Sequence, residues 1–225
     1  MTGSFVSPAT RRRVRDLATP IATALGRLGL TPNALTVIGF LGTCVAAALA
    51  LHQWWLLAGV LVLGFGIFDL FDGALARATN RATKLGAFLD STFDRAGELI
   101  VFTGIVLGLL DAGPAGRLGV FLGVWAMGAS TMVSYTRAKA ESLGFAGGSG
   151  MTGIGLAPRE VRLAILGVGL LLAGILPGPP DIDFFALHEY PSVWAVTLAL
   201  GLIAVLATIT TIQRIVHVRA QSREG

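Results

Sequence analysis

Long apolar stretches constrain the fold of this chain more than any other feature of its sequence. The stretches at residues 34–51, 118–136 and 190–213 contain no charged residue. Each is close to the ~20 residues that an α-helix needs to cross the hydrocarbon core of a bilayer. We therefore expect these segments to be transmembrane helices.

Further apolar stretches are shorter, or are continuous with charged segments. They begin at residue 54, within the segment that follows residue 85, and near residue 163. We expect their helices to continue past the membrane core. With 54% hydrophobic and 13% charged residues among 225, the chain has the composition of a polytopic membrane protein. The predicted fold is an all-α integral membrane protein with six transmembrane helices.

The N-terminal segment differs from the rest of the chain. It is rich in arginine, and Arg27 interrupts the sequence where a cleavable signal peptide would need a continuous apolar core. The stretch 8–28 instead predicts a basic amphipathic helix that lies on the membrane surface, in contact with lipid. We expect two parts, a juxtamembrane surface helix at 1–30 and a six-span domain at 31–225.

Basic residues indicate the orientation of the spans. In the predicted order of spans, Arg117 falls on one side of the membrane and the other sixteen lysines and arginines fall on the opposite side. By the positive-inside rule, we expect a multi-pass protein of the cytoplasmic membrane with both termini in the cytoplasm. The net charge of +4 is spread along the chain. It favours a membrane surface or an anionic substrate over nucleic acid as partner.

Four aspartates lie at the ends of two apolar stretches, at Asp69, Asp72, Asp90 and Asp94. A charge inside a bilayer costs about 2.5–3.5 kcal/mol on insertion scales, so their presence indicates a function. The spacings of three and four residues place each pair on one helix face, and the short connection at 78–84 predicts antiparallel neighbours that turn their carboxylates toward each other.

Carboxylates this close together repel one another unless they are protonated or bind cations. All-oxygen ligands suit Mg²⁺ or Mn²⁺, and two such ions would neutralise a diphosphate. Gly73 and Gly86 leave room beside the carboxylates for a ligand or for a neighbouring helix. The alternative is an intramembrane salt-bridge network with the nearby arginines.

The segment 69–94 matches the pattern D-x2-D-G-x2-A-R-x8-G-x3-D-x3-D at every fixed position. It resembles the signature of the CDP-alcohol phosphotransferases, as do the six-span outline, the surface helix and "TPNALT" before the first span. The resemblance implies a catalytic domain that takes a CDP-linked donor, usually CDP-diacylglycerol, transfers its phosphatidyl-type group to an alcohol and releases CMP. It also implies a homodimer.

The resemblance assigns roles to individual residues. Metal ligation is implied for Asp69, Asp72, Asp90 and Asp94, and Asp94 is also the expected general base on the acceptor hydroxyl. Gly73, Ala76 and Arg77 are expected to line the nucleotide pocket, with Arg77 on the diphosphate. Asn33 either belongs to that pocket or caps the first span.

A basic cluster indicates the acceptor. Arg137, Lys139, Arg159 and Arg162 stand at helix ends on the side of the aspartates, where they either anchor the helices or bind an anionic acceptor. Within the family, "LDSTFDR", "SYTRAKAES" and "PREVR" resemble the members that use inositol phosphate. We therefore expect inositol phosphate as acceptor, with glycerol 3-phosphate or another alcohol as the alternative.

Three other features stay open at this stage. The glycine-rich segment 144–157 departs from the family pattern and is predicted to be a flexible connector. Glu98 either supports the site or pairs with an arginine. Two other classes of protein could also use the aspartates, an intramembrane prenyltransferase, which would release pyrophosphate, and a cation carrier, which would turn over no CDP-lipid.

Overall fold

Six long helices make up most of the computed structural model, which describes residues 20–79, 81–145, 154–177 and 190–224. They are α2 (Pro32–Leu51), α3 (Trp55–Ala78), α4 (Lys84–Gly108), α5 (Gly113–Ser142), α6 (Arg159–Ile175) and α7 (Pro191–Glu224). A short helix at residues 20–27 precedes them. No strand occurs in these described ranges, so the all-α prediction is confirmed.

Four of the long helices, α2, α3, α5 and α7, are long and apolar enough to cross a membrane by length and composition. The other two differ for simple reasons, because α6 has 17 residues and α4 carries charged residues through its first half. The structure thus contains the six predicted helices, while their number of membrane crossings remains a prediction. Of the predicted surface helix at 8–28, residues 8–19 lie outside the described residues.

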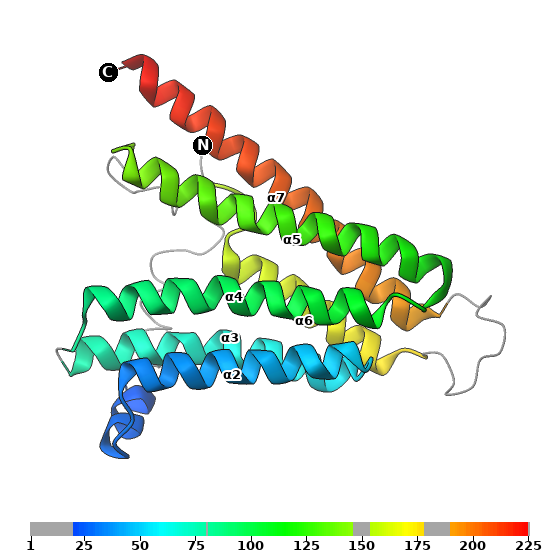
Figure 1. The fold of residues 1–225 in the computed structure, drawn as a ribbon, viewed down its shortest axis with the longest axis horizontal. Coiled ribbons are helices and arrows are strands. Elements are labelled where there is room, and N and C mark those ends of the chain that lie inside the picture. The colour runs from blue at the N-terminus through cyan, green and yellow to red at the C-terminus, as the bar shows by residue number, and fades with distance from the viewer. Residues whose placement is uncertain (1–19, 80, 146–153, 178–189, 225) are drawn as a thin grey trace.

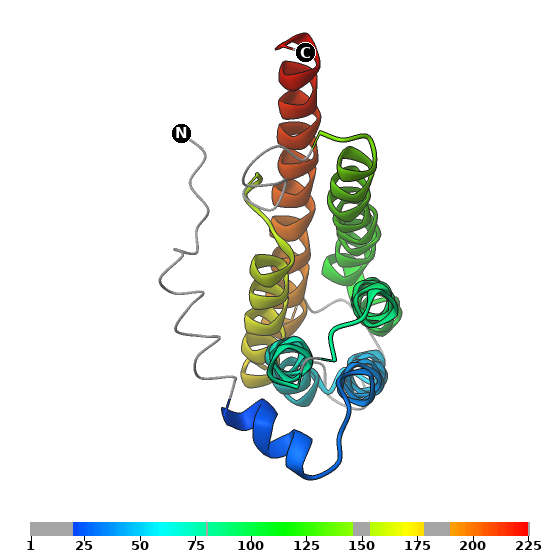
Figure 2. The same ribbon diagram turned by 90° about the vertical axis from the view of Figure 1, so that its left-hand side faces the viewer.

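The short helix at residues 20–27 lies beside α2 and α3, near one end of the bundle (Figures 1 and 2). Its Ala22 is fully buried and packs with Leu35 of α2 and Leu75 of α3. This apolar contact fixes the helix beside the ends of α2 and α3 that carry the functional residues.

Threonines set the starts of two helices at the same end of the bundle. Thr31 Oγ1 accepts a hydrogen bond from the Ala34 N–H at 3.2 Å, and Pro32 follows in the first turn of α2. Thr83 Oγ1 accepts from the Gly86 N–H at 3.0 Å and caps α4 in the same way. The signature segment therefore leaves α3 and enters α4 at defined positions.

The helices pack in a different order from the one that the signature predicts. α2 packs along both α3 and α4, α6 packs against α3 and α7, and α5 packs along α7 (Figure 1). α3 and α4 have little direct contact. The two predicted neighbours therefore do not pack directly, because α2 packs closely against both of them, and their carboxylates Asp72 and Asp90 meet as walls of one cavity.

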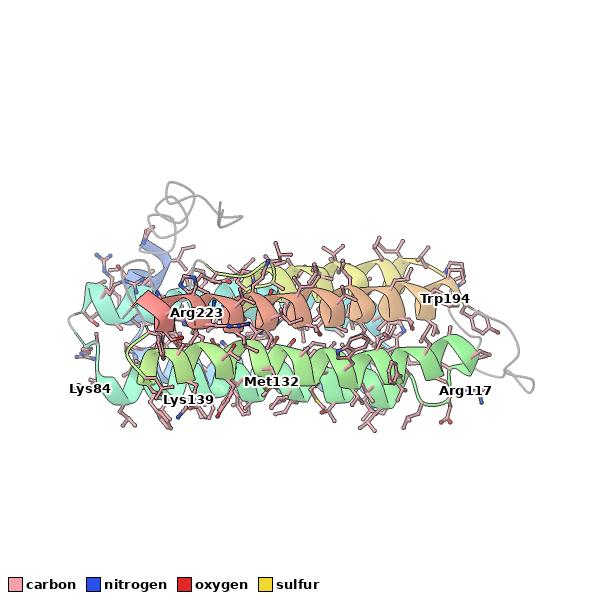
Figure 3. All side chains as sticks on the ribbon, turned by 90° about the horizontal axis from the view of Figure 1, so that it is seen from above. Lys84, Arg117, Met132, Lys139, Trp194 and Arg223 are labelled. Carbon is pink, nitrogen blue, oxygen red and sulfur yellow. The ribbon has the colours of Figure 1, made fainter. Side chains whose placement is uncertain are left out.

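The main hydrophobic core occupies the half of the bundle away from the aspartates. It gathers buried residues from all six long helices, among them Ala47, Val62, Phe102, Leu170 and Leu200. Figure 3 shows Lys84, Lys139 and Arg223 at one end of the bundle and Arg117 at the other. The aspartate end is thus the basic end, as the sequence predicts.

Candidate active site

One cavity gathers the predicted donor-binding residues. Its volume is about 230 Å³, and α2, α3 and α4 supply its walls. The predicted residues in its lining are Asn33, Asp72, Gly73, Ala76, Arg77 and Asp90. Asn33 does not cap α2, because Thr31 does so. The pocket interpretation of Asn33 is therefore the one that agrees with the structure.

Asp72 is held by groups from two helices. Its side chain is buried, and its Oδ2 accepts a hydrogen bond from Thr36 Oγ1 of α2 at 2.8 Å. The Gly73 N–H donates to Oδ1. Donors to both oxygens fix the orientation of the carboxylate. Sequence reasoning missed Thr36, although it belongs to the "TPNALT" segment.

The chemistry of the aspartates fits a divalent cation, although the structure gathers them only in part. Asp72 and Asp90 line the same cavity and offer oxygen ligands of the kind that Mg²⁺ and Mn²⁺ prefer. Asp69 lies one turn before Asp72 on α3, and its side chain lies outside the described part of the structure. Among the described side chains, no three acidic, histidine or cysteine residues form a metal-binding group.

A second and larger cavity of about 810 Å³ adjoins the first. Helices α4, α5, α6 and α7 line it, and Asp90 belongs to the walls of both cavities. Its arginines are Arg95, Arg137, Arg159, Arg162 and Arg214, and Asp94 faces them from α4. The cavity therefore offers guanidinium groups to a small anion, beside carboxylates that also include Glu141 and Glu160.

The predicted acceptor residues have different environments in this cavity. Arg159 and Arg137 line it, and Arg137 also pairs with Glu141 at 2.9 Å. Lys139 is exposed on α5 and is not part of the described lining. The structure therefore brings Lys139 to the correct end of the bundle without placing it in the cavity wall.

Arg162 requires a correction, because it is a structural residue here. Its side chain is 1% exposed, and its Nε and Nη2 donate to the two carboxylate oxygens of Glu98 at 2.8 and 2.9 Å. Its Nη1 donates to the Ala157 carbonyl at 2.9 Å. A guanidinium engaged on three sides has no face left for an acceptor phosphate. The same contacts settle the open question about Glu98, which pairs with an arginine.

Two arginines of the larger cavity were not among the predicted site residues, although Arg95 belongs to the segment "LDSTFDR". Arg95 Nη1 donates to Ser134 Oγ of α5 at 2.8 Å and lies 3.4 Å from Glu98 Oε2. Arg214 is buried on α7, where it donates to the Ile154 carbonyl at 3.1 Å and to the Val133 carbonyl. The sequence signal for Arg214 was its position on the first turn after an uncharged span.

A small internal cavity of about 30 Å³ lies between the two sites. Asp94, Glu98 and Arg159 line one part of it, and Thr36, which also lines the donor cavity, lines another. Arg159 Nη2 lies 2.8 Å from Asp94 Oδ1. Asp90 therefore lines both the donor cavity and the arginine-rich cavity, and Asp94 lines the arginine-rich cavity and the small one.

This geometry can be compared with known proteins. The family model for CDP-alcohol phosphatidyltransferase matches residues 29–210. The chain belongs to the CDP-alcohol phosphatidyltransferase family. The resemblance of segment 69–94 is thereby confirmed, and the protein is a transferase of a family of membrane enzymes. Membership favours CDP-alcohol chemistry over prenyl transfer and cation transport.

Two relatives cover nearly the whole chain. The archaetidylinositol phosphate synthase of Pyrococcus horikoshii is 34% identical over 215 residues, which are 96% of this chain and 97% of that protein. The phosphatidylinositol phosphate synthase of Cutibacterium acnes is 35% identical over 209 residues, covering 89% and 91%. Over most of its length, the chain is thus similar to enzymes named archaetidylinositol phosphate synthase and phosphatidylinositol phosphate synthase.

Solved structures give the same result. The crystal structure of Mycobacterium tuberculosis phosphatidylinositol phosphate synthase with manganese and citrate matches with a TM-score of 0.73, covering 90% of this chain and 88% of that one. The structure of the same enzyme with CDP-DAG bound has a TM-score of 0.72, with 90% and 94% covered. Both are 30% identical to this family member.

Proposed function

We propose that this enzyme transfers a phosphatidyl-type group from a CDP-lipid, in the first place CDP-diacylglycerol, to a hydroxyl of inositol phosphate and releases CMP. The observation that carries the proposal is the arginine-lined cavity of about 810 Å³ that meets the signature aspartates at Asp90 and Asp94. A phosphorylated polyol has the charge for this cavity, and its hydroxyls can reach the carboxylates while its phosphate binds arginine.

The relatives support this choice of acceptor. Their names describe synthases of archaetidylinositol phosphate and phosphatidylinositol phosphate, which differ in the lipid and agree in the inositol phosphate product. Glycerol 3-phosphate or another alcohol would use the same chemistry and is the alternative. For the donor, the Mycobacterium tuberculosis enzyme was solved with CDP-DAG bound.

The donor is assigned to the cavity of about 230 Å³. The small residues Gly73 and Ala76 leave space for the ligand along α3. Arg77 binds the diphosphate, and Asn33 contacts the nucleotide from α2. Two divalent cations, Mg²⁺ or Mn²⁺, would be held by Asp69, Asp72, Asp90 and Asp94. The structure of the Mycobacterium tuberculosis enzyme with manganese supports this class of metal. When bound, such ions neutralise the diphosphate and polarise its phosphorus–oxygen bonds.

The transfer is a single displacement at phosphorus. The acceptor hydroxyl oxygen attacks the phosphorus that carries the lipid, and Asp94 takes the hydroxyl proton. A new oxygen–phosphorus bond forms as the bond from that phosphorus to the bridging oxygen breaks, and the electron pair leaves with CMP. Arg159 and Arg137 hold the acceptor phosphate beside Asp94 during the reaction.

The enzyme's setting in the cell forms part of the proposal. All six long helices cross the cytoplasmic membrane, with the basic end and both termini in the cytoplasm. The lipid chains of the donor then lie in the bilayer, and the polar acceptor enters from water. The N-terminal segment binds the membrane surface, and two copies form a homodimer.

A panel of acceptors tests the acceptor assignment. Purified enzyme is given CDP-diacylglycerol with Mg²⁺ and either inositol phosphate, glycerol 3-phosphate, serine or free inositol, and CMP release is followed. We expect inositol phosphate to give the highest kcat/KM. Preference for glycerol 3-phosphate would replace the acceptor and keep the reaction, whereas release of pyrophosphate would contradict the reaction itself.

A further inference from the structure

Two acidic residues of α4 meet two arginines of α6 in consecutive ion pairs. Asp94 and Glu98 are four residues apart, and Arg159 and Arg162 are three apart, so each set lies on one helix face. Asp94 Oδ1 lies 2.8 Å from Arg159 Nη2, and Glu98 Oε1 lies 2.8 Å from Arg162 Nε. We call Asp94–Arg159 the outer pair and Glu98–Arg162 the inner pair.

The inner pair is a fixed connection between the two helices. Its side chains are only 5% and 1% exposed, and both carboxylate oxygens of Glu98 accept from Arg162. The segment before α6 is also held, because Thr210 Oγ1 accepts from the Ala157 N–H at 2.9 Å and Arg214 donates to the Ile154 carbonyl. The backbone at Arg159 is therefore positioned without help from the outer pair.

The outer pair has the opposite character. The side chains of Asp94 and Arg159 are 17% and 22% exposed, and both line the cavity of about 810 Å³. An anion that enters this cavity meets a guanidinium whose backbone is already fixed and whose side chain is bound to a carboxylate. The contact between Asp94 and Arg159 is therefore open to competition from the ligand.

We propose that Arg159 exchanges partners during the reaction. The phosphate of the acceptor takes the Arg159 guanidinium from Asp94. The Asp94 carboxylate, whose Oδ2 lies 3.8 Å from Arg95 Nη2, is thereby released at Oδ1 to receive the acceptor hydroxyl. This inference rests on the proposed function, because it assumes that a phosphorylated acceptor occupies the larger cavity.

The exchange replaces one charge-assisted hydrogen bond by another. A guanidinium binds a phosphate through two parallel N–H donors as readily as it binds a carboxylate, so the swap keeps its charge neutralised. An alcohol without phosphate would leave Asp94 bound to Arg159. Selection for a phosphorylated acceptor would then appear in kcat as well as in KM.

Linkage makes the exchange measurable without turnover. If phosphate must displace Asp94 from Arg159, then phosphate and Asp94 compete for the same guanidinium. The presence of Asp94 must therefore weaken the binding of phosphate. Removal of the Asp94 charge should therefore tighten phosphate binding, although the same change removes the proposed base. Couplings of this kind are typically about 5–150-fold.

Calorimetric titration of the full-length protein in detergent, without divalent cation and without donor lipid, tests the proposal, because Asp94 is also a proposed metal ligand. Inorganic phosphate and inositol phosphate are the two probes. We expect Asp94→Asn to tighten both at least about fivefold, and Arg159→Gln to weaken both about tenfold. When Arg159→Gln is already present, Asp94→Asn should tighten phosphate binding no more than the control variant Glu160→Gln does. If Arg159→Gln does not fold, Arg159→Lys, which loses the paired donors, takes its place.

Glu160→Gln is the matched control, because Glu160 lines the same cavity on α6 and its change also removes one negative charge. Tightening by Asp94→Asn that does not exceed this control, or that persists without Arg159, would overturn the exchange. Absence of inorganic phosphate binding to the wild-type protein would overturn it too. A parallel titration with glycerol 3-phosphate distinguishes failure of the acceptor assignment, because glycerol 3-phosphate would then bind more tightly than inositol phosphate while the Arg159-dependent coupling remained.

Discussion

At the scale of single residues, the carboxylate of Asp72 depends on a hydroxyl from a different helix. Thr36 Oγ1 donates to Asp72 Oδ2 at 2.8 Å. The Pro32 carbonyl, within the same helix, lies 3.2 Å from this hydroxyl and is the alternative acceptor for its single proton. A side chain that orients a metal ligand contributes to metal affinity and activity without touching the metal itself.

Replacement of Thr36 tests this dependence. Thr36→Val keeps the shape of the side chain and removes the hydroxyl, so we expect about a 10–100-fold loss of activity or of Mg²⁺ affinity. Thr36→Ser should retain both. Manganese binding followed by electron paramagnetic resonance gives a readout independent of turnover. If Thr36→Val binds manganese as tightly as the wild type and turns over normally, the orienting role is excluded.

Asp94 provides a second test at this scale. Asp94→Asn removes the proposed general base, whose contribution is typically about 10²–10⁴-fold in rate. We expect single-turnover transfer from bound CDP-diacylglycerol to slow by that order, with little change in donor affinity. The assignment of the base would be wrong if donor binding were lost and the transfer rate in the remaining complex stayed normal.

At the scale of helices, the inner pair Glu98–Arg162 joins α4 to α6 below the larger cavity. Glu98→Gln leaves the Arg162 charge buried without its carboxylate, and breaking a buried pair in this way costs about 3–5 kcal/mol. Glu141→Gln breaks the exposed pair with Arg137 and should cost about 0–1 kcal/mol. Unfolding of both variants in detergent measures the difference, and equal losses would contradict the anchoring role of the inner pair.

The close contact between α2 and α4 makes a separate prediction. A Cβ at Gly104 would lie 2.2 Å from the Ala47 carbonyl oxygen, whereas a Cβ at Gly128 on α5 would meet no atom within 4 Å. Gly104→Ala should therefore force α2 and α4 apart and lower the unfolding temperature by several degrees. Gly128→Ala should leave it unchanged or raise it, since alanine favours helix. An unchanged unfolding temperature in Gly104→Ala would show that the contact can relax.

At the scale of the whole molecule, local sequence patterns predicted the helices, whereas the contacts between helices could not be predicted from them. Apolar runs and the spacing of the aspartates predicted the helices and the common end at which their functional residues lie. The sequence did not predict which helices pack against each other. The position of α2 against both α3 and α4 depends on small residues such as Gly104, which follow no recognisable sequence pattern.

The candidate site shows the same limit. The signature predicted Gly73, Ala76 and Arg77 in the donor cavity, and "TPNALT" offered Asn33 as a further candidate, which lines the same cavity. It could not distinguish the structural role of Arg162 from the proposed binding role of Arg159, because the two arginines are only three residues apart. The difference arises from the buried Glu98, which pairs with Arg162. Thr36 and Arg214 were missed because their partners, Asp72 and the carbonyl groups of Val133 and Ile154, are distant in the sequence.

The central claim is that a phosphatidyl-type group moves intact from the CDP-lipid to inositol phosphate. The most direct measurement uses CDP-diacylglycerol labelled with ³²P at the phosphorus that bears the lipid, together with unlabelled inositol phosphate, and identifies both products by mass and by label. We predict one CMP for each lipid product, with all of the label in a lipid that carries both the transferred phosphate and the acceptor's own phosphate. Labelled CDP as the water-soluble product, or a lipid product with only one phosphate, would contradict the claim.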